Sequence, residues 1–194
     1  TYKGNYKKDL KSGSWTLSHK SFKALERFNE NNYQLNFKTT GKEIFISANF
    51  EEGVASEKWY ATERLFENSE IKDTVYTVDA NFKDSKLVES LNASFPNLKV
   101  KLNFNDKGFA DGEWVFGHDF EGQYIEDIIS FKDGIYKNRE LIIEGKSMEI
   151  EQLGLDKDFE KPTTINYDDG MSVVLDLINF KPISRSFSES QFQK

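Results

Sequence analysis

Apolar and polar residues alternate over short stretches along most of the chain. The clearest run, residues 98–104, has Leu, Val, Leu and Phe at every second position, with Lys, Lys and Asn between them. This period of two is typical of a strand with one buried face and one face in water. Similar runs occur at residues 33–37, 43–50, 74–82, 124–131, 140–150 and 172–180. The pattern predicts a mainly β protein, with about eight or more strands in an antiparallel sheet or a pair of sheets.

One segment, residues 84–95, predicts a short helix instead. Its apolar residues fall at helical spacing: Leu87, Val88, Leu91 and Phe95. Asp84 or Ser85 would cap the first turn, and Pro96 would prevent continuation. A second segment, residues 56–68, has apolar residues on all sides and fits a helix or a strand equally well.

We expect one repeat-type β domain over residues 1–194. Two loosely similar halves, residues 1–95 and 96–183, are indicated because both histidines occur four residues after a tryptophan, at positions about half a chain apart. Residues 184–194 are rich in Ser and Gln, which predicts a frayed polar tail.

All three tryptophans follow the same sequence pattern. An aromatic residue, two polar residues, Gly or Asp, and five further residues precede Trp15 and Trp59, and Trp114 follows the same pattern with one inserted residue. The first part of the pattern, without a following Trp, also occurs at residues 37–41, 82–85, 131–134 and 167–170. The polar step supplies the positive φ of a tight turn, and the next strand carries Trp inward. Each unit is therefore predicted to be a β-hairpin, and the hairpins must stack into one sheet because a single hairpin buries little.

The stretches YKKDLKSGSW, FEEGVASEKW and FNDKGFADGEW resemble the degenerate MORN-variant repeat. The sequence departs from that repeat where Gly is replaced by Asp9 and Ser85, and where Glu57 and Lys58 stand in place of Gly-x before Trp. The resemblance implies a meandering antiparallel sheet of a kind common in bacterial envelope proteins. It also implies a scaffold or interaction surface without catalytic residues.

Composition narrows the function classes. The chain has 26 Lys and Arg against 33 Asp and Glu, a net charge of −7, and the two signs are interspersed. Nucleic acid is not an expected partner, because there is no basic stripe to contact phosphates. The absence of Cys excludes disulfides, thiolate nucleophiles and zinc–cysteine sites. No apolar run approaches the roughly 18 residues of a membrane-spanning helix, so no span is expected.

The sequence begins at Thr1, with no initiator Met and no apolar leader. Removal of a signal peptide or lipoprotein leader is one reason for such a start. We therefore expect a bacterial periplasmic protein, an outer-membrane lipoprotein with its lipid anchor upstream of Thr1, or a secreted protein.

Few residues suggest chemistry. His19 and His118 each end an inward-facing strand stripe, where a structural role is expected, and whether they meet stays open. Among many acidic residues, Glu113 and Asp119 are the least implausible acid pair for glycoside hydrolysis. Oxygen ligands in residues 105–111 would suit calcium, but their spacing does not match a twelve-residue calcium loop. We predict no catalytic residues, no metal and no cofactor.

The sequence thus predicts a non-catalytic scaffold or protein-interaction module with a protein partner. The alternative is a carbohydrate-binding protein or a hydrolase acting on carbohydrate. The candidate binding residues are Trp15, Trp59 and Trp114, because exposed aromatic rings stack on sugars or fill a partner's pockets. Burial of these three side chains favours the scaffold, whereas a groove lined by them would favour sugar chemistry.

Overall fold

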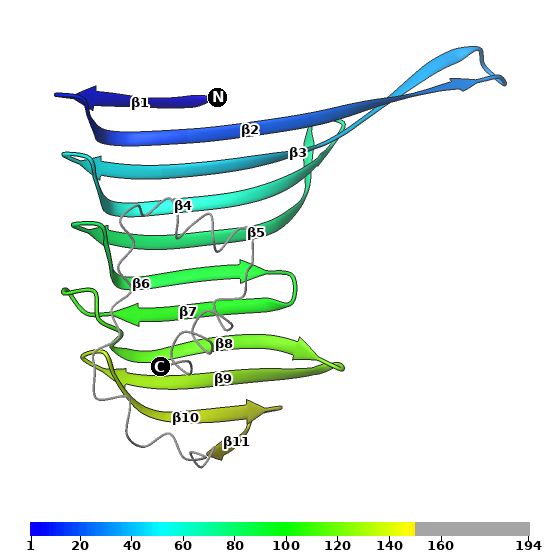
Figure 1. Cartoon of the computed structure of the whole chain (residues 1–194). Helices are drawn as coiled ribbons and strands as arrows, with labels where there is room; N and C mark the ends of the chain where they lie inside the picture. The colour runs from blue at the N-terminus through cyan, green and yellow to red at the C-terminus, as the bar shows by residue number, and fades with distance from the viewer. Residues whose placement is uncertain (150–194) are drawn as a thin grey trace, which may run out of the picture.

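The computed structural model describes residues 1–149, which form one antiparallel sheet (Figure 1). Its strands follow one another in space in chain order. They are β1 (Tyr2–Lys7), β2 (Leu10–Asn29), β3 (Gln34–Glu51), β4 (Val54–Glu67), β5 (Glu70–Lys83), β6 (Lys86–Phe95), β7 (Leu98–Phe104), β8 (Gly112–Phe120), β9 (Gln123–Lys132), β10 (Ile135–Ile143) and β11 (Lys146–Glu149). The predicted mainly β, antiparallel meander is confirmed.

The predicted helix at residues 84–95 is wrong, because these residues form a turn and strand β6. A β-bulge explains the misleading spacing: Val88 pairs with Asn81, whereas Leu91 pairs with the very next residue of β5, Ala80. The extra residues include Glu89, whose φ is +59°. The bulge takes Glu89 and Ser90 out of the pairing with β5, so the core-facing residues Leu87, Leu91 and Phe95 recur four residues apart, which is also a helical spacing. The ambiguous segment 56–68 lies mostly in β4 and is also a strand.

Several predicted boundaries differ from the structure. Residues 33–37 and 43–50 do not form separate strands, because β3 spans nearly all of both. Residues 140–150 are not one strand, since β10 ends at Ile143 and β11 begins at Lys146. The predicted strand at 172–180, the first part of the pattern at 167–170 and the tail at 184–194 lie outside the described residues.

The sheet continues across the junction of the two predicted halves. β6 and β7 pair along their length, from Glu89 with Phe104 to Phe95 with Leu98. In the part of the chain that the structure describes, the two halves therefore belong to the same sheet.

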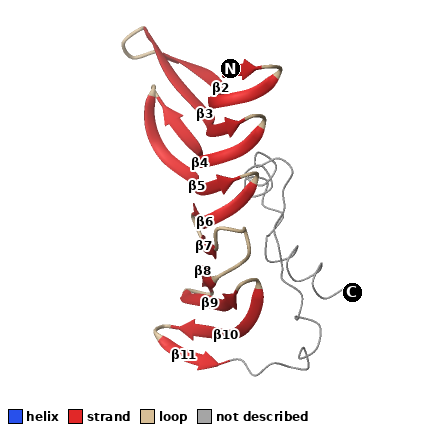
Figure 2. Cartoon of the chain, turned by 90° about the vertical axis from the view of Figure 1, so that its left-hand side faces the viewer, coloured by secondary structure: helices blue, strands red, loops and turns tan. Residues whose placement is uncertain are grey.

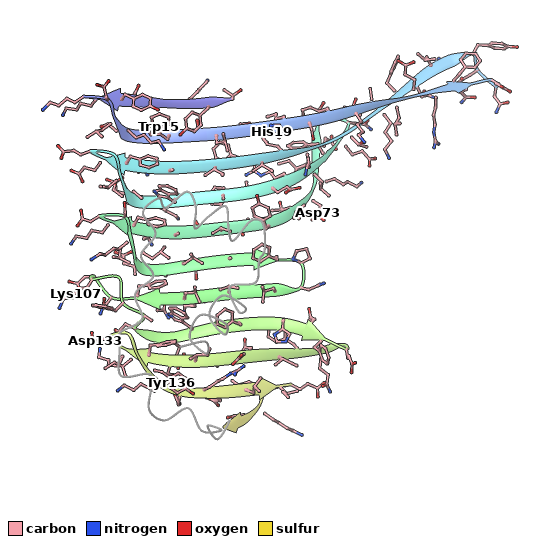
Figure 3. The ribbon with its side chains drawn as sticks, in the orientation of Figure 1. Trp15, His19, Asp73, Lys107, Asp133 and Tyr136 are labelled. Atoms are coloured by element: carbon pink, nitrogen blue, oxygen red, sulfur yellow. The ribbon has the colours of Figure 1, made fainter. Side chains whose placement is uncertain are left out.

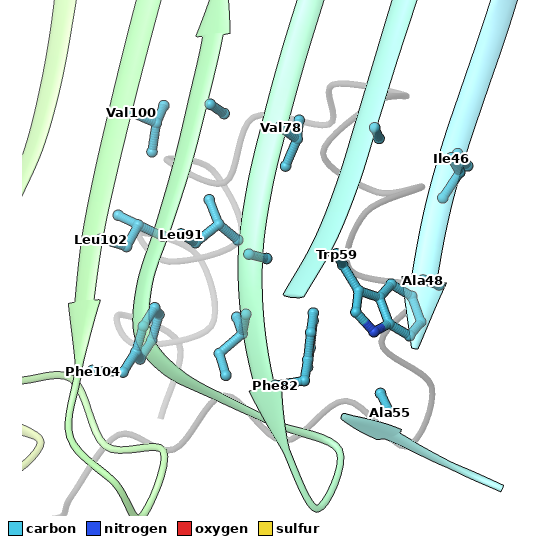
Figure 4. Packing of buried hydrophobic residues seen from close by; sticks show 14 of the residues in the cluster. Ile46, Ala48, Ala55, Trp59, Val78, Phe82, Leu91, Val100, Leu102 and Phe104 are labelled. Carbon is cyan, nitrogen blue, oxygen red and sulfur yellow. The ribbon is translucent and has the colours of Figure 1, made fainter. Parts of the chain in front are cut away.

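The core lies on one face of this sheet. Cross-strand neighbours on that face are buried together, so that Ala61 pairs with Ile46 on one side and with Val78 on the other. Aromatic rings continue the contacts from hairpin to hairpin: the Trp59 ring centroid lies 5.1 Å from that of Phe50 and 4.9 Å from that of Phe82 (Figure 4).

At one end of the sheet the hairpin turns curve toward the same side, while the β2–β3 turn lies on the other side (Figure 2). Backbone geometry explains the curvature. A left-handed residue follows four residues after a left-handed turn residue in each case: Gly13 after Asp9, Glu57 after Gly53, Glu89 after Ser85 and Gly112 after Gly108. Such bulge residues bend a strand and increase its twist. Glu57, which departs from the Gly-x-Trp pattern, thus adopts the same conformation as the glycines that it replaces.

Backbone hydrogen bonds join neighbouring hairpin ends. The amide of Gly53 donates to the carbonyl of Lys11 over 2.9 Å, and the amide of Ser85 donates to the carbonyl of Ala55 over the same distance. Gly134 donates to Ala110 in the same way, over 2.7 Å. The bent ends are therefore stacked on one another as well as joined through the main sheet.

Candidate functional site

The three predicted binding residues do not form an exposed aromatic surface. Trp15, Trp59 and Trp114 are 2%, 0% and 1% exposed. Their rings pack among the aromatic residues of the hairpin ends. An exposed aromatic surface must therefore be sought elsewhere in the described residues.

Trp59 binds backbone carbonyl groups that the bulge in its own strand leaves unpaired. Its indole Nε1 donates to the carbonyl of Asn49 over 3.0 Å and to that of Ser56 over 3.2 Å. In return, the side-chain amide of Asn49 donates to the carbonyl of Lys58 over 2.9 Å. This reciprocal pair fixes the ring in the core.

Trp114 has the same arrangement. Its Nε1 donates to the carbonyl of Asn103 over 2.8 Å, and the Asn103 amide donates to the carbonyl of Glu113 over 2.6 Å. The sequence pattern that precedes each tryptophan was defined from the aromatic residue onward, so it did not include these asparagines. The signal was present, since Asn directly precedes that aromatic at Asn5, Asn49, Asn81 and Asn103.

The two histidines do not meet. His19 is exposed on β2 (Figure 3), and His118 is half-buried on β8. Strands β3 to β7 lie between them. With strands about 4.8 Å apart, the two residues are separated by roughly 29 Å across the sheet.

The proposed acid pair is also not brought together. Glu113 and Asp119 both lie on β8, exposed and six residues apart. A rise of about 3.3 Å per residue places them roughly 20 Å apart. Glycoside hydrolysis requires carboxyl groups within about 10 Å of each other. Within residues 1–149, no cluster of three or more His, Asp or Glu side chains has the arrangement of a metal site.

The oxygen atoms of loop 105–111 are engaged within the protein. Asn105 Oδ1 accepts hydrogen bonds from the amides of Lys107 and Phe109, over 3.1 and 3.0 Å. Asp111 Oδ1 accepts from the amide of Asp133 over 3.0 Å. This hydrogen bond, aided by Lys132 at 3.3 Å, lowers the pKa of Asp111. The Asn105 oxygen therefore shapes the turn of the loop, and the Asp111 oxygen joins the loop to the β9–β10 turn.

A different feature exposes apolar side chains, and it comes from the unequal lengths of the strands. β1 pairs with β2 only as far as Leu17, and β4 pairs with β3 only as far as Thr40. Beyond these points β2 and β3 continue alone as a two-stranded ribbon that projects from the sheet (Figure 1). We call residues 22–39 the arm.

One face of the arm is apolar. Strand register places Phe22 opposite Gly41, Ala24 opposite Thr39, Glu26 opposite Phe37 and Phe28 opposite Leu35, all on one face. Four large side chains on that face, which we call the arm stripe, are strongly exposed: Phe22 50%, Phe28 57%, Leu35 49% and Phe37 60%. Side chains project from both faces of the arm, and beyond its base no other described strand pairs with it (Figure 3).

The opposite face of the arm is mainly basic and polar. Leu25 pairs with Lys38 on this face, and Arg27 pairs with Asn36. Lys23 lies on it as well. The arm is therefore amphipathic, with its charge largely separated from the arm stripe.

Contacts at both ends give the arm a defined shape. At its base, the ring centroid of Phe22 lies 6.1 Å from that of Phe66 on β4. At its tip, the amide of Asn31 donates to Asn29 Oδ1 over 3.0 Å. The amide of Gln34 likewise donates to the Asn32 side chain over 3.1 Å.

Ion pairs also join the strands at the base of the arm. Glu43 Oε1 lies 2.9 Å from Lys20 Nζ and accepts a hydrogen bond from Ser18 Oγ over 3.1 Å. These contacts lower the pKa of Glu43 below its usual value, the hydrogen bond from Lys20 being the largest cause. Lys42 pairs with Glu63 across β3 and β4 at 3.5 Å.

No helix among the described residues has the length and apolar character required to cross a membrane. Comparisons of the chain with protein-family models, with curated proteins and with solved structures found no match.

Proposed function

We propose that this protein is a non-catalytic scaffold and protein-interaction module whose binding surface is the arm stripe. The observation that carries the proposal is the exposure of four large apolar side chains on one face of a projecting ribbon. With about 200 Å² for each aromatic side chain, the stripe amounts to roughly 400 Å² of apolar surface. Continuous exposed patches of a few hundred Å² mark interaction sites on soluble proteins.

The remainder of the sheet suits a scaffold that presents this arm. A two-stranded ribbon alone is marginally stable in water, so the arm depends on the sheet that continues from its base. The ion pair between Lys20 and Glu43 joins β2 to β3 at this base, and the hydrogen bond from Gly53 to Lys11 holds the opposite end of β2 against the β3–β4 turn. The arm is thus presented in a defined direction.

Two further parts of the proposal concern family and location. The matching contacts of Trp59 and Trp114 with Asn49 and Asn103 support an internal repeat, which membership of the MORN-variant repeats requires. A bacterial envelope or secreted location accompanies that resemblance, and cell fractionation tests it. The burial of the three tryptophans favours protein interaction over carbohydrate binding.

Site-specific photo-crosslinking tests the proposed function. The photo-reactive residue benzoylphenylalanine replaces Phe37 on the arm stripe, and in a matched control it replaces Asn36, its neighbour on the opposite face. In an extract of the source cells we expect protein adducts at position 37 and few at position 36. Equal adducts at both positions, or none at either, would contradict the proposal.

A further inference from the structure

We propose that the arm stripe binds the arm stripe of a second copy of this chain. The two arms stack face to face and antiparallel, about a two-fold axis that crosses the arm. This inference rests on the proposed function, because it assigns the occupant of the same surface.

The sizes of the side chains along the stripe are complementary to themselves. On β3, residues of this face run from small to large toward the tip: Gly41, Thr39, Phe37 and Leu35. In an antiparallel stack of β3 on β3, centred between Thr39 and Phe37, each Phe37 lies opposite a Thr39 of the other copy. Each Leu35 likewise lies opposite a Gly41. Large side chains therefore meet small ones at both positions, as an isologous contact requires.

The β2 side of the stripe is complementary as well. The same axis places Phe22 of one copy opposite Phe28 of the other, twice, which forms two aromatic pairs. Glu26 lies opposite the small side chain of Ala24, so the two Glu26 carboxylates do not face each other. Stacking the arms in parallel would instead place Glu26 against Phe37 and Phe28 against Leu35, so that large side chains would meet large ones.

The charges of the arm permit this contact. Glu26 is the only charged side chain on the striped face between positions 22 and 41. The cations Lys23, Arg27 and Lys38 are on the opposite face and stay in water when two stripes meet. The polar tip, with Glu30 and two asparagines, opposes insertion of the arm into a lipid bilayer.

The area is sufficient for a modest dimer. Two stripes of roughly 400 Å² each bury about 800 Å² of apolar surface. The stack also brings each tip turn, where Tyr33 is exposed, toward the base of the other arm, where Ile71 is exposed. These additions raise the total toward the 1,000 Å² or so that a specific interface requires.

Sedimentation velocity of the full chain over a range of concentrations tests the inference. We expect a concentration-dependent dimer. Phe37→Ser should weaken dimerisation at least about tenfold, because it removes a central aromatic of the contact. Leu25→Ser is the matched control, since Leu25 is similarly exposed but lies on the opposite face. It should leave the dissociation constant within about twofold, as expected for a residue outside the interface. Circular dichroism verifies that both variants are folded.

Cysteine cross-linking tests the geometry independently, because the chain has no cysteine of its own. Ala24→Cys introduces a thiol on the striped face, near the proposed axis, and Lys23→Cys introduces one on the opposite face. A short bis-maleimide should link two copies of Ala24→Cys covalently and should not link two copies of Lys23→Cys. Equal cross-linking of the two variants would overturn the stacking.

The remaining outcomes separate this inference from the proposed function. A chain that stays monomeric at every concentration, while the cross-linker at position 37 attaches to a different protein, overturns self-association and supports the proposed function. A dimer that Phe37→Ser leaves intact places the contact elsewhere and overturns the stacking of the arm stripes. A monomer that binds vesicles of phosphatidylcholine and phosphatidylglycerol through Phe37, without protein adducts at position 37, overturns both.

Discussion

Strands β2 and β3 pass through two regions of the molecule. Similar side chains are buried in one region and exposed in the other. At the bent end of the sheet, Trp15, Ile46 and Phe50 are buried. In the arm, Phe22 and Phe37 on the same two strands are half-exposed or more. At the bent end, each strand has a neighbour on both sides, and stacked hairpin ends add further contacts. In the arm, each strand has one neighbour, and Phe22 and Phe37 lie on the face opposite to that of Trp15 and Ile46. Aromatic residues of one strand therefore stabilise the fold in one region and remain available for binding in the other.

The largest expected difference is between the truncation of a buried aromatic residue at the bent end and that of an exposed aromatic residue in the arm. Trp59→Ala should lower the free energy of unfolding by about 3–5 kcal/mol, because it removes a fully buried ring and leaves a cavity. Phe37→Ala should lower it by less than about 1 kcal/mol, because its side chain is already largely in water. Urea denaturation measures both.

Trp114→Ala serves as a second test of the buried region, with an expected loss of about 3–5 kcal/mol. A loss under about 1 kcal/mol would contradict the assignment of Trp114 to the core. Losses of equal size for Trp59→Ala and Phe37→Ala would remove the contrast between the two regions.

A smaller effect is expected where β1 covers the bent end. Gly4 lies against the indole ring of Trp15, and a Cβ atom at this position would overlap with the ring. Gly4→Ala should therefore destabilise the packing of β1 by about 1–3 kcal/mol. Hydrogen exchange of the β1 amides measures the loss. Lys3→Ala, on the adjacent residue, is the control and should leave the exchange rates nearly unchanged.

The bulges that bend the hairpin ends are expected to respond in opposite directions to paired substitutions. Glu57→Gly should raise the free energy of unfolding by about 1 kcal/mol, since Glu57 has a φ of +55° and a left-handed residue with a Cβ is strained. Gly112→Ala should lower it by about 1 kcal/mol for the same reason, at a φ of +78°. Thermal unfolding of both variants decides the point, and changes of the same sign would contradict this role of the bulges.

The smallest effect is expected from pH at the base of the arm. Because the pKa of Glu43 is lower in the folded chain than in the unfolded chain, its contacts with Lys20 and Ser18 stabilise the fold above the unfolded pKa. This stabilisation is lost as the pH falls through the folded pKa. Wild type should therefore lose more stability than Glu43→Gln on acidification below about pH 4.5. Denaturation at neutral and acidic pH measures the difference, and equal losses would show that Glu43 does not couple the arm base to pH.

Local sequence patterns were reliable where a strand is regular. Residues 98–104 alternate without interruption, and β7 has the same bounds. The pattern misled where a bulge interrupts the alternation, as at Glu89, because the core-facing Leu87 and Leu91 on either side of it are four residues apart, a spacing that a helix also has. The asparagines that bind the two tryptophans were visible in the sequence. Their role was not, because it depends on carbonyls that are left free only when the strand bends.

The exposure of the arm stripe could not be predicted from the sequence either. Phe22, Ala24 and Phe28 occur at alternating positions, as in any half-buried strand. Nothing in their order indicates that β1 ends before the level of Phe22 and β4 before the level of Ala24, since strand length is a property of the neighbours.

The sequence by itself determined the class of fold, because period-two alternation and polar turns act over a few residues and need no distant partner. The tertiary structure decided which aromatic residues are core and which are surface. That outcome depends on which strands lie on either side of a residue and on how far those strands extend, and both are set by contacts between residues far apart in the chain.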